Sequence, residues 1–119
     1  MRTIVIVLVA FFCSSLLFAA SPNFLHNVTP ISDFTKEDSE LFWNSVIDAL
    51  DNKKDGEKLA WQNEKTGNSG LVNPLNTYQE DDSQCRDLRI LNRSKKNIAE
   101  SKYKFCKHDG KWVAINIIQ

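Results

Sequence analysis

Two cysteines in the C-terminal half of the chain, Cys85 and Cys106, restrict what this sequence can fold into. A bond between them would close a loop of about twenty residues, which the chain-entropy model equates with roughly 3 kcal/mol of stability. Disulfides persist in oxidising compartments, so the pairing depends on export of the chain. A metal site that recruits His108 beside both thiols is the alternative, but it needs reduced thiols and a fourth ligand.

The N-terminus has the pattern of a secretory signal. Met1-Arg2-Thr3 gives a positive start, an apolar run follows over 4–18, and Ala19-Ala20-Ser21 ends it with small residues. The run is shorter than the ~20 apolar residues of a membrane-spanning helix. We therefore expect a signal peptide at 1–20, no transmembrane span in the mature chain, and a Cys85–Cys106 disulfide.

Cys13 lies inside the apolar run and raises the alternative of a lipidated cysteine. A lipidated cysteine would follow a small residue at the end of the run, whereas Phe11 and Phe12 precede Cys13 and apolar residues continue beyond it. We therefore assign Cys13 to the segment that is removed. An uncleaved anchor is a further alternative, and cleavage after Ala20 or after Ser21 stays open.

The mature part is nearly neutral and is large enough for one modest domain. The whole chain has 15 Lys and Arg against 15 Asp and Glu, and only Arg2 of these lies in the signal segment. This balance argues against charge-driven binding to nucleic acid or to a membrane surface. Residues 21–34 contain Pro22 and Pro30 without a periodic pattern, so we expect an irregular lead-in there, followed by a domain at 35–119.

A helix is expected at about 36–53. Thr35 is a candidate N-cap, and Asp38 three residues later gives a weaker form of the capping box. An apolar stripe with helical spacing follows. It consists of Trp43, Val46, Ile47 and Leu50, with Phe42 and Ala49 beside it. We expect the stripe to pack on the domain's own core, with docking of a partner as the alternative.

Beyond Gly56, short apolar or alternating runs are separated by turn residues at intervals of roughly ten, as in consecutive antiparallel strands. We expect strands at 57–62, 70–78, 84–92, 100–107 and 111–118. Pro74 cannot donate a hydrogen bond to a neighbouring strand, so its strand should be an edge or be bulged there. The expected fold is α+β, with one N-terminal amphipathic helix packed on an antiparallel sheet of four or five strands.

Side-chain alternation predicts how two of these strands pair. Cys85 opposite Cys106 sets Leu88 opposite Tyr103 on the other face, which places the disulfide on the face away from the core. Arg86 then points to the core side. A half-buried arginine needs carboxylate or carbonyl partners, so we expect a structural salt bridge, with a ligand contact as the alternative.

Two registers are open for the last hairpin: a two-residue turn at Asp109-Gly110, or a three-residue loop with Gly110 in a bulge. We favour the loop because it groups the apolar residues. Trp112 then lies beside the disulfide, rimmed by Arg89 and Lys104. Because Trp is enriched at binding hot spots, we expect these three residues to contact a partner. The alternative is that Trp112 packs on the disulfide for stability alone.

Catalysis finds little support in the sequence. His108 and Asp109 are neighbours in a turn, which rarely orients two side chains as a catalytic triad requires. The acidic run at 80–82 lacks the glycine-containing spacing of a calcium loop. The loop with Gly67 and Gly70 lacks the P-loop lysine. We therefore expect no enzyme activity, no cofactor and no metal.

Several short motifs together resemble one known family. They are, in chain order, Trp61-Gln62-Asn63, Thr66-Gly67-Asn68-Ser69-Gly70, Tyr78, Cys85-Arg86, Cys106 and Asp109-Gly110-Lys111-Trp112. Over about residues 45–113, their order and spacing resemble the C-terminal domain of the 17 kDa surface-antigen family of bacterial envelope proteins. The resemblance implies a non-catalytic protein of the outer membrane or cell surface.

The chain departs from that family in lacking a lipidation cysteine of the usual kind and a glycine-rich segment before the domain. A periplasmic or secreted form is therefore an alternative to the outer membrane. We expect an exported binding or structural module whose partner is an envelope component or another protein. The alternative functions are a secreted or periplasmic enzyme inhibitor and, with less support, a small hydrolase.

Overall fold

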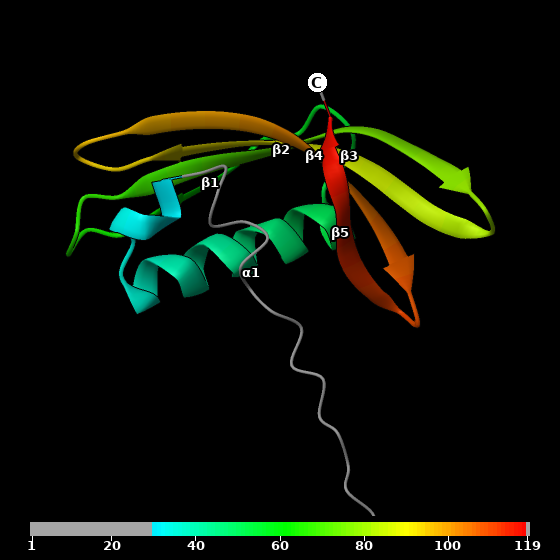
Figure 1. Cartoon of the computed structure of the whole chain (residues 1–119), viewed down its shortest axis with the longest axis horizontal. Helices are drawn as coiled ribbons and strands as arrows, with labels where there is room; N and C mark the ends of the chain where they lie inside the picture. The colour runs from blue at the N-terminus through cyan, green and yellow to red at the C-terminus, as the bar shows by residue number, and fades with distance from the viewer. Residues whose placement is uncertain (1–29, 119) are drawn as a thin grey trace, which may run out of the picture.

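The computed structural model describes residues 30–118, so the signal peptide expected at 1–20, with Cys13, lies outside the described residues. One helix, α1 (Lys36–Asn52), packs on a five-stranded antiparallel sheet with the strand order β1-β2-β3-β4-β5 (Figure 1). The strands are β1 (Leu59–Gln62), β2 (Ser69–Glu80), β3 (Ser83–Arg93), β4 (Ile98–His108) and β5 (Lys111–Ile118).

This arrangement confirms the α+β prediction, with five strands. The helix precedes the sheet in sequence, but it begins at Lys36 and is not at the N-terminus of the chain. Within the described residues, no helix is long and apolar enough to cross a membrane.

The first turn of α1 has the predicted capping box. Thr35 Oγ1 accepts a hydrogen bond from the N–H of Asp38 at 3.2 Å, and Asp38 Oδ2 accepts one from the N–H of Thr35 at 2.8 Å. Each side chain therefore satisfies a backbone N–H that has no partner within the helix.

The buried face of α1 is rotated relative to the prediction. Phe42, Val46 and Ala49 are fully buried, whereas Ile47 is 42% exposed. The buried positions follow the i, i+4, i+7 spacing of one helix face. Placing Ile47 in the stripe was therefore wrong, because the bulky Phe42, which lies 6.4 Å from the Trp61 ring, defines the face that meets the sheet.

The sheet supplies the other half of the core. Its buried apolar side chains that face α1 are Trp61, Val72, Leu88, Ile90, Tyr103 and Phe105. The strand with Pro74 is an interior strand, and its pairing shifts between Pro74 and Asn76. The predicted bulge is therefore confirmed, and it lets an interior strand accommodate a proline.

Residues 30–34 were expected to be irregular, but they form a short 3-10 helix, η2 (Pro30–Asp33), followed by Phe34. Phe34 packs edge-on against Trp61, with ring centroids 5.3 Å apart. Asp33 Oδ2 accepts hydrogen bonds from Ser94 Oγ (3.1 Å) and Asn97 Nδ2 (2.9 Å). The prediction was wrong for these residues because contacts far along the chain, which the local sequence does not show, hold them on the domain.

Strands β3 and β4 pair in the predicted register. Cys85 lies opposite Cys106, Leu88 lies opposite Tyr103, and a disulfide joins the two cysteines. The disulfide is on the face of the sheet that points away from α1, which we call the outer face.

The last hairpin has the register that we did not favour. His108 pairs with Lys111 around a two-residue turn at Asp109-Gly110, whose φ angles are 51° and 74°. A two-residue turn with positive φ at both positions matches the twist of the flanking strands, and Asp-Gly suits it. Turn geometry therefore outweighed the grouping of apolar side chains on which the prediction depended.

Candidate functional site

The first motifs of the family resemblance surround a buried carboxylate. Asp38 is fully buried. Its Oδ1 accepts hydrogen bonds from Asn63 Nδ2 (2.8 Å) and Thr66 Oγ1 (2.7 Å), while Oδ2 accepts from Asn68 Nδ2 (2.8 Å) and from the N–H of Thr35. These contacts fix the β1–β2 loop to the start of α1.

Burial by itself would raise the pKa of Asp38. Its hydrogen bonds, led by the Thr35 N–H, outweigh burial and lower the pKa from 3.8 to about 2. The positive end of the helix dipole also favours the carboxylate. With four donors around a group that has about four lone-pair sites, Asp38 has a structural role.

Gly70, the last residue of the 66–70 motif, allows a close approach between side chains and backbone. Gly70 lies opposite Trp61 in the β1–β2 pair. A side chain at Gly70 would collide with the Trp61 indole and with the Asn92 amide. Trp61 can therefore lie over β2 only because position 70 has no side chain.

Arg86, also part of the resemblance, caps the other end of α1. It is 5% exposed, and its Nη1 donates hydrogen bonds to the carbonyl oxygens of Ala49 (3.1 Å) and Leu50 (2.7 Å). Its Nη2 donates to Asp55 Oδ1 (3.0 Å) and its Nε donates to Thr77 Oγ1 (2.8 Å). The expected carbonyl and carboxylate partners are confirmed. The guanidinium supplies donors to carbonyls of the last turn of α1, of which Ala49 O also accepts from the Lys53 N–H.

The carboxylate partner of Arg86 is itself perturbed. Burial opposes ionisation of Asp55, but hydrogen bonds from Arg86 and Thr77, together with the charge of Arg86, lower the pKa of Asp55 below 3.8. Asp55 is therefore ionised at neutral pH.

Trp112 does not lie where we expected it. It pairs with Lys107 on the face of the sheet that carries α1, and its Nε1 donates a hydrogen bond to Asp51 Oδ1 at 2.7 Å. The predicted contact site of Trp112 with Arg89 and Lys104 is therefore not assembled. The shorter turn moves each of the first β5 side chains to the opposite face of the sheet, so Val113 and not Trp112 lies opposite Cys106.

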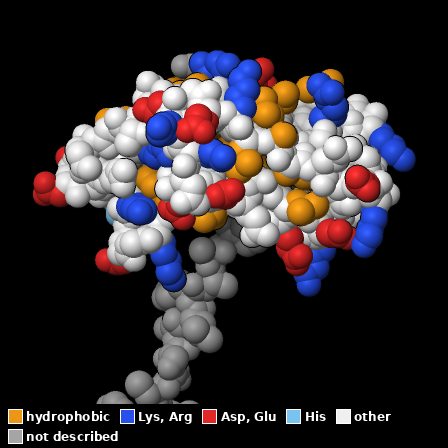
Figure 2. All heavy atoms as spheres, turned by 180° about the vertical axis from the view of Figure 1, so that it is seen from behind, with side chains coloured by type: hydrophobic (Ala, Val, Ile, Leu, Met, Phe, Trp, Pro, Cys, Tyr) orange, Lys and Arg blue, Asp and Glu red, His pale blue; other side chains and the backbone are white. Residues whose placement is uncertain are grey.

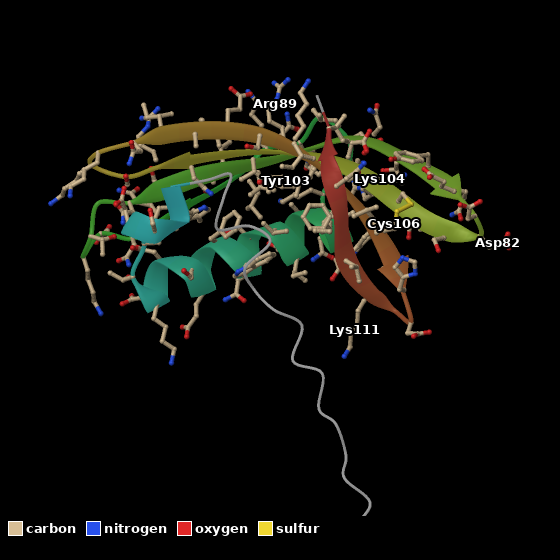
Figure 3. The ribbon with its side chains drawn as sticks, in the orientation of Figure 1. Asp82, Arg89, Tyr103, Lys104, Cys106 and Lys111 are labelled. Carbon is tan, nitrogen blue, oxygen red and sulfur yellow. A yellow bond between two sulfur atoms is a disulfide. The ribbon has the colours of Figure 1, made fainter. Side chains whose placement is uncertain are left out.

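Arg89 and Lys104 do lie on the outer face. Figure 3 shows Arg89 pointing away from α1, whereas Tyr103 lies between the sheet and the helix. Arg89 Nε is 3.1 Å from Glu100 Oε1, and Lys104 forms an ion pair with Glu80. Ion pairs therefore cross the outer face, from β3 to the neighbouring β4 and from β4 to β2 across β3.

Strand pairing arranges the outer face in rows across the sheet. The row at the disulfide consists of Tyr78, Cys85, Cys106 and Val113. The next row contains Asp87 and Lys104, and the row beyond it contains Asn73, Arg89 and Lys102.

Tyr78 is held in place beside the disulfide. Its hydroxyl donates a hydrogen bond to Asp87 Oδ1 at 2.8 Å. Burial raises the pKa of Tyr78 to about 12, with further contributions from the hydrogen bond and charge of Asp87. The phenol therefore stays protonated at physiological pH and acts as a hydrogen-bond donor.

Two apolar side chains of β5, one in the disulfide row and one beside it, are exposed on the outer face. Val113 is 43% exposed and Ile115 is 42% exposed. Ile115 lines a cavity of about 180 Å³ together with Lys104 and Cys106. These two residues were not predicted to be exposed, because the favoured register turned them toward the core.

Charges of both signs are interspersed with small apolar patches on the side of the molecule that Figure 2 shows. His108 is exposed at the end of β4. Within the described part of the chain, no group of three His, Cys, Asp or Glu side chains is placed to hold a metal ion. The metal alternative with His108 and two thiols is excluded, because both cysteines are in the disulfide.

Comparisons with protein-family models, with curated proteins and with solved structures found no match. The structural roles of Asp38, Gly70 and Arg86 give physical reasons for several residues of the surface-antigen resemblance. The family itself stays a proposal.

Proposed function

We propose that this chain is an exported, non-catalytic binding module of the bacterial cell envelope. The disulfide between Cys85 and Cys106 carries the proposal, because such bonds are kept in oxidising compartments. The signal-like pattern at 1–20 supports the same destination. The bacterial envelope comes from the resemblance to the surface-antigen family.

The outer face is the surface that we propose for binding. Asp38 and Arg86 are fully engaged at the two ends of α1, and α1 covers the other face of the sheet. The outer face offers Val113 and Ile115 beside the disulfide, bordered by ion pairs. An apolar centre with a polar rim is the usual anatomy of a protein contact surface.

Binding can be tested by sedimentation of the oxidised protein with cell envelopes. Ile115→Ser should weaken binding about tenfold, or about 1.4 kcal/mol, because it removes an apolar contact from the outer face. Ile47→Ser is a matched control, since Ile47 is also 42% exposed but lies on α1. Equal binding by both variants and the unaltered protein would exclude Ile115 from the contact with the envelope.

The place of the protein in the envelope is tested on intact cells. Protease added outside should digest the protein if it is displayed on the surface and should spare a periplasmic pool. Recovery of the protein in the cytosol alone would contradict the proposal.

A further inference from the structure

The outer face has a second cavity, of about 140 Å³, several residues along the strands from the disulfide. We call it the Arg89 pocket, and its lining residues are Lys58, Leu71, Asn73, Arg89, Leu91 and Glu100. Asn73 pairs with Arg89 in one row, while Leu71, Leu91 and Glu100 form the adjacent row. The pocket therefore places hydrogen-bonding groups beside an apolar floor.

Two polar atoms of the Arg89 pocket are buried without a hydrogen-bond partner. Asn73 is 9% exposed and its Oδ1 accepts no hydrogen bond, and Arg89 Nε donates none. Glu100 Oε1 is 3.1 Å from Arg89 Nε, so the two form an ion pair, but the N–H is not directed at the carboxylate. Because buried polar groups are nearly always bonded, the open acceptor of Asn73 beside the Arg89–Glu100 ion pair indicates a ligand that donates to Asn73 and competes with Glu100 for Arg89.

The charges around the pocket favour an anionic ligand. Lys58 is exposed at its rim, and no carboxylate of the described residues forms an ion pair with it. Glu100 is the one acidic residue of the lining, and its side chain is 56% exposed, so it can move outward. Arginine and lysine together suit a carboxylate, which forms charge-assisted hydrogen bonds with both.

We infer that the Arg89 pocket binds the carboxyl-terminal residue of a peptide. The terminal carboxylate pairs with Arg89 and Lys58, and the N–H of the terminal residue donates to Asn73 Oδ1. A small side chain lies against Leu71 and Leu91. The cavity has the volume of about four or five water molecules at ~30 Å³ each, which suits a residue the size of alanine. The inference rests on the proposed function as a binding module and specifies its ligand.

The test is a titration of the oxidised, purified protein with N-acetyl-Ala-Ala. Binding is measured from the chemical-shift changes of the protein's backbone amides in NMR spectra. The dipeptide with a free carboxylate should bind saturably, and its carboxamide should bind at least about tenfold more weakly because it lacks the charge. Dipeptides that end in L- or D-alanine distinguish a protein terminus from a cell-wall peptide. Saturable binding of either stereoisomer supports the pocket, and binding of neither overturns it.

Variants distinguish peptide binding in the Arg89 pocket from nonspecific binding elsewhere on the protein. Arg89→Gln should weaken binding about tenfold, whereas Glu100→Gln should tighten it several-fold because it removes a competing carboxylate. Lys65→Gln is the control, since Lys65 is also a cation in an ion pair, with Glu37 at the start of α1, and should leave affinity unchanged. A folded Arg89→Gln variant with unaltered affinity, or equal binding of carboxylate and carboxamide, would overturn the inference.

The outcomes also separate this inference from the proposed function. Sedimentation with envelopes but no peptide binding would remove the ligand assignment alone. Peptide binding by a protein that never reaches the envelope would contradict the proposed function and leave the pocket assignment intact.

Discussion

Two buried charges, Asp38 and Arg86, hold the two ends of α1. Each is surrounded by hydrogen-bond partners, which buried charges require because their loss of hydration is costly. Asp38 joins the helix to the β1–β2 loop, and Arg86 joins it to β2 and β3. Removing either charge should therefore loosen the contact between helix and sheet.

Asp38→Asn should destabilise the protein by about 2–4 kcal/mol at neutral pH, because the new amide N–H₂ would face hydrogen-bond donors. The pKa of Asp38 is about 2 in the folded protein against 3.8 ordinarily, so the carboxylate stabilises the fold. That stabilisation, about 2 kcal/mol, is complete above about pH 4 and disappears as the pH falls toward about 2. Urea unfolding across this range should show that the difference in free energy of unfolding between the unaltered protein and the variant narrows as the pH falls.

The control for this experiment is Asp48→Asn. Asp48 is an exposed residue of α1 that accepts a hydrogen bond from Asn52 Nδ2. Its replacement should change stability little at any pH. If the loss of unfolding free energy in Asp38→Asn, relative to the unaltered protein, stays constant from neutral pH to about pH 2, the role of the ionised carboxylate is contradicted.

Arg86→Lys should lower the free energy of unfolding by about 2–4 kcal/mol even though the charge is kept. A lysine ammonium cannot reach the carbonyls of Ala49 and Leu50, Asp55 and Thr77 at once as the guanidinium does. Denaturant unfolding measures the loss, with the exposed Arg93→Lys as the control. Equal stability of the two variants would show that the guanidinium contacts are not needed.

The helix and strands themselves follow from local sequence. Thr35 and Asp38 predicted the start of α1, and the turn residues predicted all five strands within two residues at every end. The rotation of α1 was not predictable from periodicity, because Phe42 and Ile47 are both apolar and only packing against Trp61 distinguishes them. The last hairpin shows that turn chemistry can decide a register that apolar patterning leaves open.

The turn between β2 and β3 offers a test of this point. Asp81 and Asp82 occupy it with φ angles of 48° and 63°, a conformation that favours glycine. Asp82, at the tip of the hairpin in Figure 3, should be replaceable by glycine with a gain of about 1 kcal/mol. A rise of roughly 4–8 °C in Tm is expected, and Asp82→Ala should give none of it. A lower Tm for Asp82→Gly would contradict the turn geometry.

For the molecule as a whole, part of the candidate site was predictable from the sequence. Alternation from the disulfide put Arg89 and Lys104 on the outer face, where they lie. Trp112 was misplaced because its facing depended on the length of one turn. The Arg89 pocket was not predictable, since the sequence indicated a bulge at Pro74 but not the β2–β3 register that places Asn73 opposite Arg89.

The export of this domain can be decided by trapping thiols in intact cells that produce the full chain. Acid quenching, alkylation with a mass-adding maleimide and fractionation should report the state of Cys85 and Cys106 in each compartment. We predict that the protein is found with the envelope or periplasm and that these two cysteines resist alkylation until a reductant is added. Protein in the cytosol with both thiols free would contradict the account.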